Sequence, residues 1–137
     1  MLPSFNYNFG PSRHIRWNEF GCKDGTAYPF EWRANRAIIL AELFELIRTD
    51  CGNKPIKIHS AYRTPTYNYM VDGVTNSQHL YGRALDLGLP RGINIHQFHQ
   101  IIVNLPLSTD LKGIGKYKTF VHIDIRPTVE RAYWDYS

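Results

Sequence analysis

Two short segments with alternating side chains constrain the fold more than any other feature of this sequence. Residues 83–89 have leucine at every odd position from 85 onward, and Asp86 lies in the middle of the even positions. Residues 120–126 alternate branched aliphatic residues with an even-numbered set that includes His122 and Asp124. Because successive side chains of a strand point to opposite faces, both segments are predicted strands with one aliphatic face on the core. Exposure to solvent alone is a poor explanation for the ionisable residues Asp86 and His122 on the opposite face.

Apolar spacing predicts two helices. Pro29 suits a first helical position and Gly52 a position just past a helix end, so Pro29 to about Cys51 is predicted as one long helix. This helix is apolar on more than one side, which is typical of a helix covered by other elements. Residues 93–104 repeat apolar side chains at helical spacing before Pro106.

The remaining segments predict one more strand and a single folded unit. Residues 55–59 alternate two isoleucines with Lys57 and His59, and a long loop with a possible helical turn follows to Ser77. There is no repeat or linker, so residues 1–137 are predicted to form one domain, with 1–28 as an irregular segment packed on it. The predicted fold class is α+β, a small and mostly antiparallel sheet with helices on one face.

Composition limits the classes of partner. The chain of 137 residues is 43% hydrophobic and 20% charged, which is typical of a folded domain that needs no disulfide framework. Cys22 and Cys51 are expected as free thiols, because no secretion signal is visible and Cys51 falls on the apolar side of the long helix. The alternative is that they close a loop by a disulfide if the protein works outside the cell. The net charge of +4 favours loose attraction to polyanions, but the basic residues are scattered, so no specific nucleic-acid partner is expected.

The sequence contains no apolar run of the length that a membrane span needs. Its first residues also lack the basic and then apolar pattern of a signal peptide. We therefore expect synthesis in the cytoplasm without a visible signal peptide, and no membrane insertion.

His79, Asp86 and His122 are candidate metal ligands. A catalytic zinc site uses three ligands of the histidine and carboxylate type and leaves a fourth position open. Gly82 would allow a tight turn between the first ligand and its strand, and Ala84 would leave room above the sheet.

A simpler interpretation leaves these residues without a metal. Asp86 would then be an edge-strand carboxylate paired with Arg83 or Arg126, and His79 would be an ordinary loop histidine. A histidine and an aspartate seven residues apart are a weak signal, so the spacing alone does not decide between the two interpretations.

Three motifs follow one another along the chain: Ser60-Ala-Tyr-Arg63-Thr-Pro65, then Ser77-x-His79-x-x-Gly82-x-Ala84-x-Asp86, then Gly113-Ile-Gly115-x-Tyr117-x-x-Phe120-Val-His122-Ile-Asp124-Ile-Arg126. In this order they resemble the zinc D-Ala-D-Ala carboxypeptidase family, and in particular the branch that ends in His-x-Asp-x-Arg and is common in phages and bacteria. Residues 14–22 are similar to the N-terminal segment of that branch, so the resemblance covers about residues 14–126.

The resemblance implies a fold shared with the hedgehog signalling domain and zinc bound by His79, Asp86 and His122. It also implies hydrolysis of peptidoglycan stem peptides by a carboxypeptidase or a murein endopeptidase, in cell-wall remodelling or as a phage endolysin. Such a protein would act on the cell wall, in the periplasm or outside the cell, and we expect a monomer. The alternative is a zinc-stabilised wall-binding module without turnover.

The predicted catalytic residues are Asp124 and Arg63. Better-known branches of the family have a carboxylate three residues before the last histidine as catalytic base, but here Thr119 occupies that position. Asp124 lies on the same strand face as His122, so it is the predicted base, and its alternative role is to support His122 or pair with an arginine. The family's arginine in the Tyr-Arg motif implies that Arg63 faces the substrate, and Ser77 is predicted to add a substrate hydrogen bond.

Overall fold

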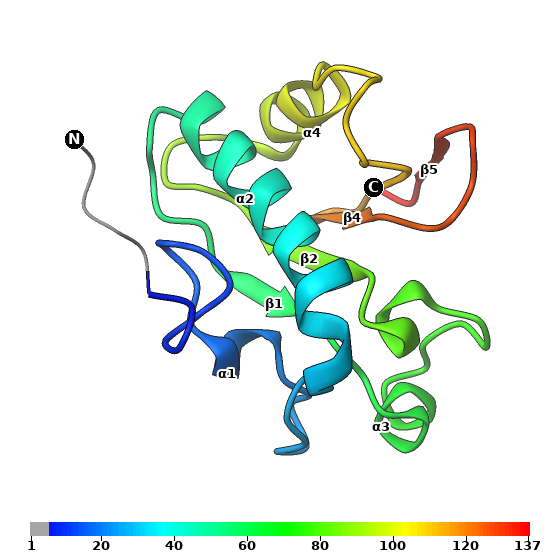
Figure 1. The fold of residues 1–137 in the computed structure, drawn as a ribbon. Coiled ribbons are helices and arrows are strands. Elements are labelled where there is room, and N and C mark those ends of the chain that lie inside the picture. Colours follow the sequence, from blue (N-terminus) through cyan, green and yellow to red (C-terminus); the bar gives the residue numbers. More distant parts are fainter. Residues whose placement is uncertain (1–5) are drawn as a thin grey trace.

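A computed structural model describes residues 6–137, and its centre is a five-stranded sheet in the order β1-β2-β4-β3-β5 (Figure 1). The strands are β1 (Ile58–Ser60), β2 (Ala84–Gly88), β3 (Gly113–Lys116), β4 (Phe120–Asp124) and β5 (Ala132–Asp135). Three of the neighbouring pairs are antiparallel, and β5 pairs with β3 in parallel. The predicted α+β class with a mostly antiparallel sheet is confirmed.

Both alternating segments form the strands that their pattern predicts. β2 and β4 lie next to each other in the middle of the sheet, and Asp86 lies directly opposite His122. Their aliphatic side chains, Leu85, Leu87, Val121 and Ile123, are buried in the core. The opposite face of the same strands is thereby left for the ionisable residues.

The predicted long helix is one helical run, but it is not a regular α-helix. Pro29 caps the 3₁₀ turn η1 (Phe30–Trp32), which leads into the π-helical turn η2 (Arg33–Ala37) and then α2 (Ile38–Asp50). Apolar periodicity does not distinguish these hydrogen-bonding patterns, because η1 and η2 are each too short for a different period to become visible. The prediction was therefore right about the run and wrong about its first two turns.

The other helices are short. α4 (Ile95–Val103) begins with a capping box formed by Asn94 and Gln97, within the residues predicted to be helical. α1 (Trp17–Phe20) lies in the segment predicted as irregular, and α3 (Pro65–Met70) in the predicted loop with a possible helical turn. The 3₁₀ turn η3 (Gln78–Tyr81) follows that loop, in residues for which no element was predicted. Among residues 6–137 no helix has the length and apolar character needed to span a membrane.

The hydrophobic core lies between the sheet and the two longest helices, α2 and α4 (Figure 1). Phe44 and Ile47 of α2 and Phe98 and Ile102 of α4 are almost fully buried there. The N-terminal segment adds Phe20 to the same core. Cys22 and Cys51 are buried and form no disulfide, as expected.

Candidate metal centre

A single row of residues crosses all five strands on the face of the sheet away from this core. Ser60 lies opposite Asp86, Asp86 opposite His122, His122 opposite Gly115, and Gly115 opposite Trp134. Directly opposed residues in a sheet have Cβ atoms about 4.5–5.5 Å apart, so their side chains meet. Strand register therefore brings together residues from β1, β2, β4 and β5 in one place.

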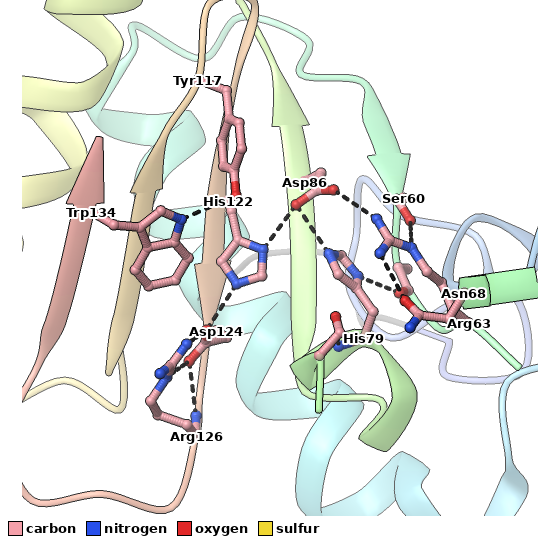
Figure 2. Close-up of polar contacts among 12 residues, drawn as sticks. Ser60, Arg63, Asn68, His79, Asp86, Tyr117, His122, Asp124, Arg126 and Trp134 are labelled. Atoms are coloured by element: carbon pink, nitrogen blue, oxygen red, sulfur yellow. Dashed lines mark hydrogen bonds and ion pairs between the residues drawn. The ribbon is translucent and has the colours of Figure 1, made fainter. Parts of the chain in front are cut away.

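His79 joins this row from η3 and completes a buried cluster (Figure 2). The Oδ1 atom of Asp86 lies 3.1 Å from Nε2 of His79 and 3.0 Å from Nδ1 of His122. One ligand atom from each of the three residues lies within 4.8 Å of the other two, so the cluster has the dimensions of a metal site. Gly82 ends η3 with a φ of 64°, which a glycine adopts without strain, and this turn leads the chain from His79 into β2.

The second nitrogen of each histidine is held by an acceptor on the protein. His79 Nδ1 lies 2.6 Å from the carbonyl oxygen of Ala61, and His122 Nε2 lies 2.8 Å from Oδ2 of Asp124. A carbonyl only accepts, so Nδ1 of His79 carries the proton and Nε2 is the nitrogen with a lone pair. Metal-ligating histidines are held in this way, and two imidazoles with one carboxylate are a donor set that suits zinc. The residues therefore fit a zinc ion.

Burial and charge set the protonation of the cluster. Burial lowers the pKa of His79 below its ordinary value in spite of the nearby Asp86 carboxylate, and a neutral imidazole is the form that binds a metal. Burial alone would raise the pKa of Asp86, but its interactions with His79 and His122 outweigh burial and keep the pKa well below the usual range. Asp86 is therefore an ionised carboxylate between two imidazoles.

Asp124 is fully buried and lies on the other side of the His122 ring from Asp86 (Figure 2). Its Oδ1 accepts hydrogen bonds from Nε and the backbone N–H of Arg126, and its Oδ2 accepts one from Nη2 of Arg126. Burial would raise the pKa of Asp124, but the hydrogen bonds from Arg126 and His122 lower it to about 2. Of the two roles predicted for Asp124, this geometry favours support of His122 over proton transfer.

Arg63 lies at the other end of the cluster, where its guanidinium contacts three partners (Figure 2). Nη2 donates to Oδ2 of Asp86 at 3.3 Å, Nε to the hydroxyl of Ser60 at 3.1 Å, and Nη1 to Oδ1 of Asn68 at 3.2 Å. Asp86 is thus paired with Arg63, not with Arg83 or Arg126. The hydroxyl of Ser77, predicted to contact substrate, accepts a hydrogen bond from the backbone N–H of His79.

Comparison with known protein families adds an independent observation. The family described as Peptidase M15 matches residues 13–124, which include all three residues of the metal cluster. The chain belongs to the peptidase M15 family. This membership confirms the predicted family, while the narrower branch ending in His-x-Asp-x-Arg stays a prediction.

One curated relative is similar to a shorter stretch. A zinc D-Ala-D-Ala carboxypeptidase from Streptomyces albus G is 41% identical over 56 residues, which are 41% of this chain and 22% of that protein. The chain thus matches less than a quarter of the length of this relative. Together with the His-Asp-His donor set, membership of the peptidase M15 family implies zinc as the cofactor.

An aromatic wall beside the cluster was not predicted, and part of it lies beyond the residues matched to the peptidase M15 family. The wall consists of Tyr117, Phe120 and Trp134, and the Trp134 ring lies 5.1 Å from that of His122. A Cβ atom on Gly115 would lie 2.3 Å from Nε1 of Trp134, so this glycine makes room for the indole. The third motif already contained Tyr117 and Phe120 beside the two glycines, but nothing in it indicated Trp134.

The cluster and the wall line one groove with a cavity volume of about 440 Å³. Its lining residues include Arg63 and Ser77, both predicted site residues, and also Asp72. Asp124 is not among the lining residues, which agrees with its position behind His122. The groove therefore presents His79, Asp86 and His122 to an approaching ligand.

Proposed function

We propose that this chain is a zinc-dependent peptidase that hydrolyses peptide bonds in peptidoglycan stem peptides. The observation that carries the proposal is the buried cluster of His79, Asp86 and His122 in an open groove of a peptidase M15 chain. The Streptomyces relative supports D-Ala-D-Ala termini as the substrate class. A role in wall remodelling or phage lysis rests on the sequence resemblance described above.

In this proposal the three cluster residues hold the ion, and their neighbours keep them in place. When bound, zinc supplies Lewis acidity and lowers the pKa of water toward neutrality. Asp124 accepts the hydrogen bond from Nε2 of His122 and so directs Nδ1 toward the groove. Trp134 covers one side of that imidazole and limits the access of water.

Arg63 orients the substrate. A guanidinium has five N–H donors. Three of them contact Ser60, Asn68 and Asp86. The other two make no hydrogen bond within residues 6–137 and are available for a carboxylate or a carbonyl oxygen of the substrate. Because Arg63 also pairs with Asp86, substrate contact and ligand placement are combined in one side chain.

Removal of one ligand tests the metal assignment. His122→Ala is expected to lose nearly all bound zinc, because a catalytic site with two protein ligands is incomplete. The matched control is His96→Ala, which removes an exposed imidazole on α4 and should retain one zinc per chain. Elemental analysis of both purified variants gives the result, and full zinc content in His122→Ala would overturn the assignment.

Hydrolysis separates the enzyme from a zinc-stabilised binding module. The zinc-loaded protein is expected to release fragments from purified peptidoglycan, detected by mass spectrometry, and His122→Ala should release none. Zinc binding without release of any fragment would instead favour the binding module.

The C-terminus of the substrate tests the role of Arg63. If Arg63 binds a terminal carboxylate, peptides ending in free D-Ala-D-Ala should be cleaved much faster than the same peptides with an amidated end. Arg63→Gln should then remove this preference. Equal rates of the native protein on both peptides would exclude the carboxypeptidase and favour cleavage inside the stem.

A further inference from the structure

A second cavity, of about 330 Å³, lies at one end of the sheet and is lined by four cationic side chains. Arg83 precedes β2, Lys112 precedes β3, Arg126 follows β4, and Arg36 comes from the π-helical turn η2. Each of the four side chains is partly buried. We call the cavity that these four side chains line the cationic cavity. Of the four, Arg126 alone also belongs to the metal centre, where it holds Asp124.

Most of this positive charge has no carboxylate partner within residues 6–137. The Arg83 guanidinium makes no hydrogen bond or ion pair there, and its carbon atom lies over the Tyr81 ring, 5.9 Å from the ring centre. Lys112 donates to the carbonyl of Val129, and Arg36 donates to the carbonyl of Tyr81. Backbone carbonyls satisfy single donors but leave the positive charges unneutralised.

The lining offers little to offset this charge. Asp110 is the one acidic residue in the lining, and it is exposed and forms no ion pair within the described part of the chain. Burial and repulsion from Arg83 lower the pKa of Arg36, which is consistent with cations held close together. An anion placed among these groups would relieve this repulsion.

Arg126 lies between the cationic cavity and the groove of the metal cluster, since it lines both. Asp124 occupies its Nε and Nη2 atoms, while Nη1 makes no hydrogen bond within residues 6–137. The free N–H groups of Arg126 and the whole Arg83 guanidinium thus remain available as donors in one cavity. Arginine pairs of this kind suit the flat or tetrahedral oxygens of carboxylate and phosphate groups.

We propose that the cationic cavity binds an oxyanion, a carboxylate or a phosphate group, at a site separate from the metal cluster. Arg83 and Lys112 supply direct charge-assisted contacts, and Arg126 contributes its unused nitrogen. Anion binding at this site is measured without turnover, so this proposal can fail while the proposed peptidase function stands, and the reverse.

The test uses the zinc-loaded, ¹⁵N-labelled protein titrated with sodium sulfate, with sodium chloride at matched ionic strength as reference. Sulfate presents phosphate-like oxygens and competes weakly for zinc. The expected result is a saturable shift of the backbone amides near Arg83, Lys112 and Thr128. In Arg83→Gln with Lys112→Gln, apparent affinity should fall by roughly tenfold or more, because two charge-assisted contacts are lost.

A charge-matched control is Lys23→Gln with Lys57→Gln, which removes two exposed lysines elsewhere and should leave the titration unchanged. Arg83→Gln alone provides a second variant that is expected to fold, since this side chain makes no hydrogen bond within residues 6–137. A parallel titration with sodium acetate identifies the chemistry: saturation by sulfate alone supports a phosphate ligand, and saturation by acetate alone supports a carboxylate. The absence of saturation with both anions, or unchanged affinity in the Arg83 variants, would overturn the proposal.

Discussion

His79 and His122 lie on either side of Asp86, and the protein holds them in different ways. The ring of His79 is held by the backbone carbonyl of Ala61. The backbone carbonyl of His79 in turn accepts a hydrogen bond from the backbone N–H of Arg63. The ring of His122 is held by the Asp124 side chain, which Arg126 in turn fixes. One ligand thus depends on the path of the main chain and the other on two further side chains.

This difference has chemical consequences. The carbonyl beside His79 brings no net charge, and burial lowers the pKa of that histidine. Burial also acts to lower the pKa of His122, but hydrogen bonds and charges from Asp124 and Asp86 raise it above its ordinary value. A carboxylate partner makes an imidazole a more basic ligand than a carbonyl partner does. We therefore expect His122 to contribute more to the affinity for a metal ion than His79.

The largest effect is expected for Asp124→Asn, which keeps the size of the side chain but removes its charge. If Asp124 supports His122, zinc affinity should fall by roughly ten- to a hundredfold, and excess zinc should restore turnover. Zinc affinity is measured by competition with a chelator, and turnover on a D-Ala-D-Ala peptide with and without added zinc.

The same variant tests the predicted base. Normal zinc affinity with turnover lower by about two to four orders of magnitude would identify Asp124 as the base and contradict the support role. Asp50→Asn, which neutralises an exposed aspartate at the end of α2, is the matched control and should change neither quantity. If neither quantity changes in Asp124→Asn, Asp72 in the groove becomes the next candidate for the base.

An intermediate effect is expected for Gly115→Ala, because Gly115 leaves room for the Trp134 indole beside the His122 ring. The added Cβ would overlap the Trp134 indole, whose displacement also breaks the hydrogen bond from Nε1 to the hydroxyl of Tyr117. We expect a loss of about 1–3 kcal/mol in the free energy of unfolding, measured by urea denaturation.

A double-mutant cycle with Trp134→Ala isolates this contact. Once the indole is absent, the alanine at position 115 has room, so its additional cost should fall toward zero. If Gly115→Ala costs the same in both backgrounds, its effect comes from another source and the packing argument fails.

The smallest effect is expected for Ala61→Gly. The acceptor for His79 is the main-chain oxygen of this residue, so the hydrogen bond is kept, and zinc affinity should not change. Stability should fall by about 1–2 kcal/mol, because glycine gives the unfolded chain more freedom and because the buried methyl group of Ala61 is lost from the core. A loss of zinc affinity as large as that of Asp124→Asn would remove the contrast between the two histidines.

Much of the sheet was predictable because alternation is a local signal. β2 and β4 each carry it within one segment, so both strands and their two faces were predicted correctly. β3 contains Gly113 and Gly115, which have no side chain to alternate. β5 pairs in parallel with β3, a distant segment, and so carries no hairpin signal.

The residues of the metal centre could be predicted from the sequence, but most of the contacts between them could not. Spacing places His122 and Asp124 on one face, but only the three-dimensional structure shows which ring nitrogen each carboxylate contacts. The pairing of Asp86 with Arg63 joins β2 to a loop 23 residues earlier. Side-chain direction across strands depends on register and on the rotamer, and neither follows from local sequence.

A metal ion bound between β2 and β4 also shifts the folding equilibrium. Asp86 and His122 are 36 residues apart in the chain, and their ligand atoms converge only when the two central strands are paired. An unfolded chain offers no such converging set, so zinc binds the native state preferentially and acts as a reversible cross-link. At a free zinc concentration a hundred times its dissociation constant, this linkage adds about 2.7 kcal/mol to the free energy of unfolding. The thermal resistance of the protein is thereby tied to the zinc supply of its surroundings.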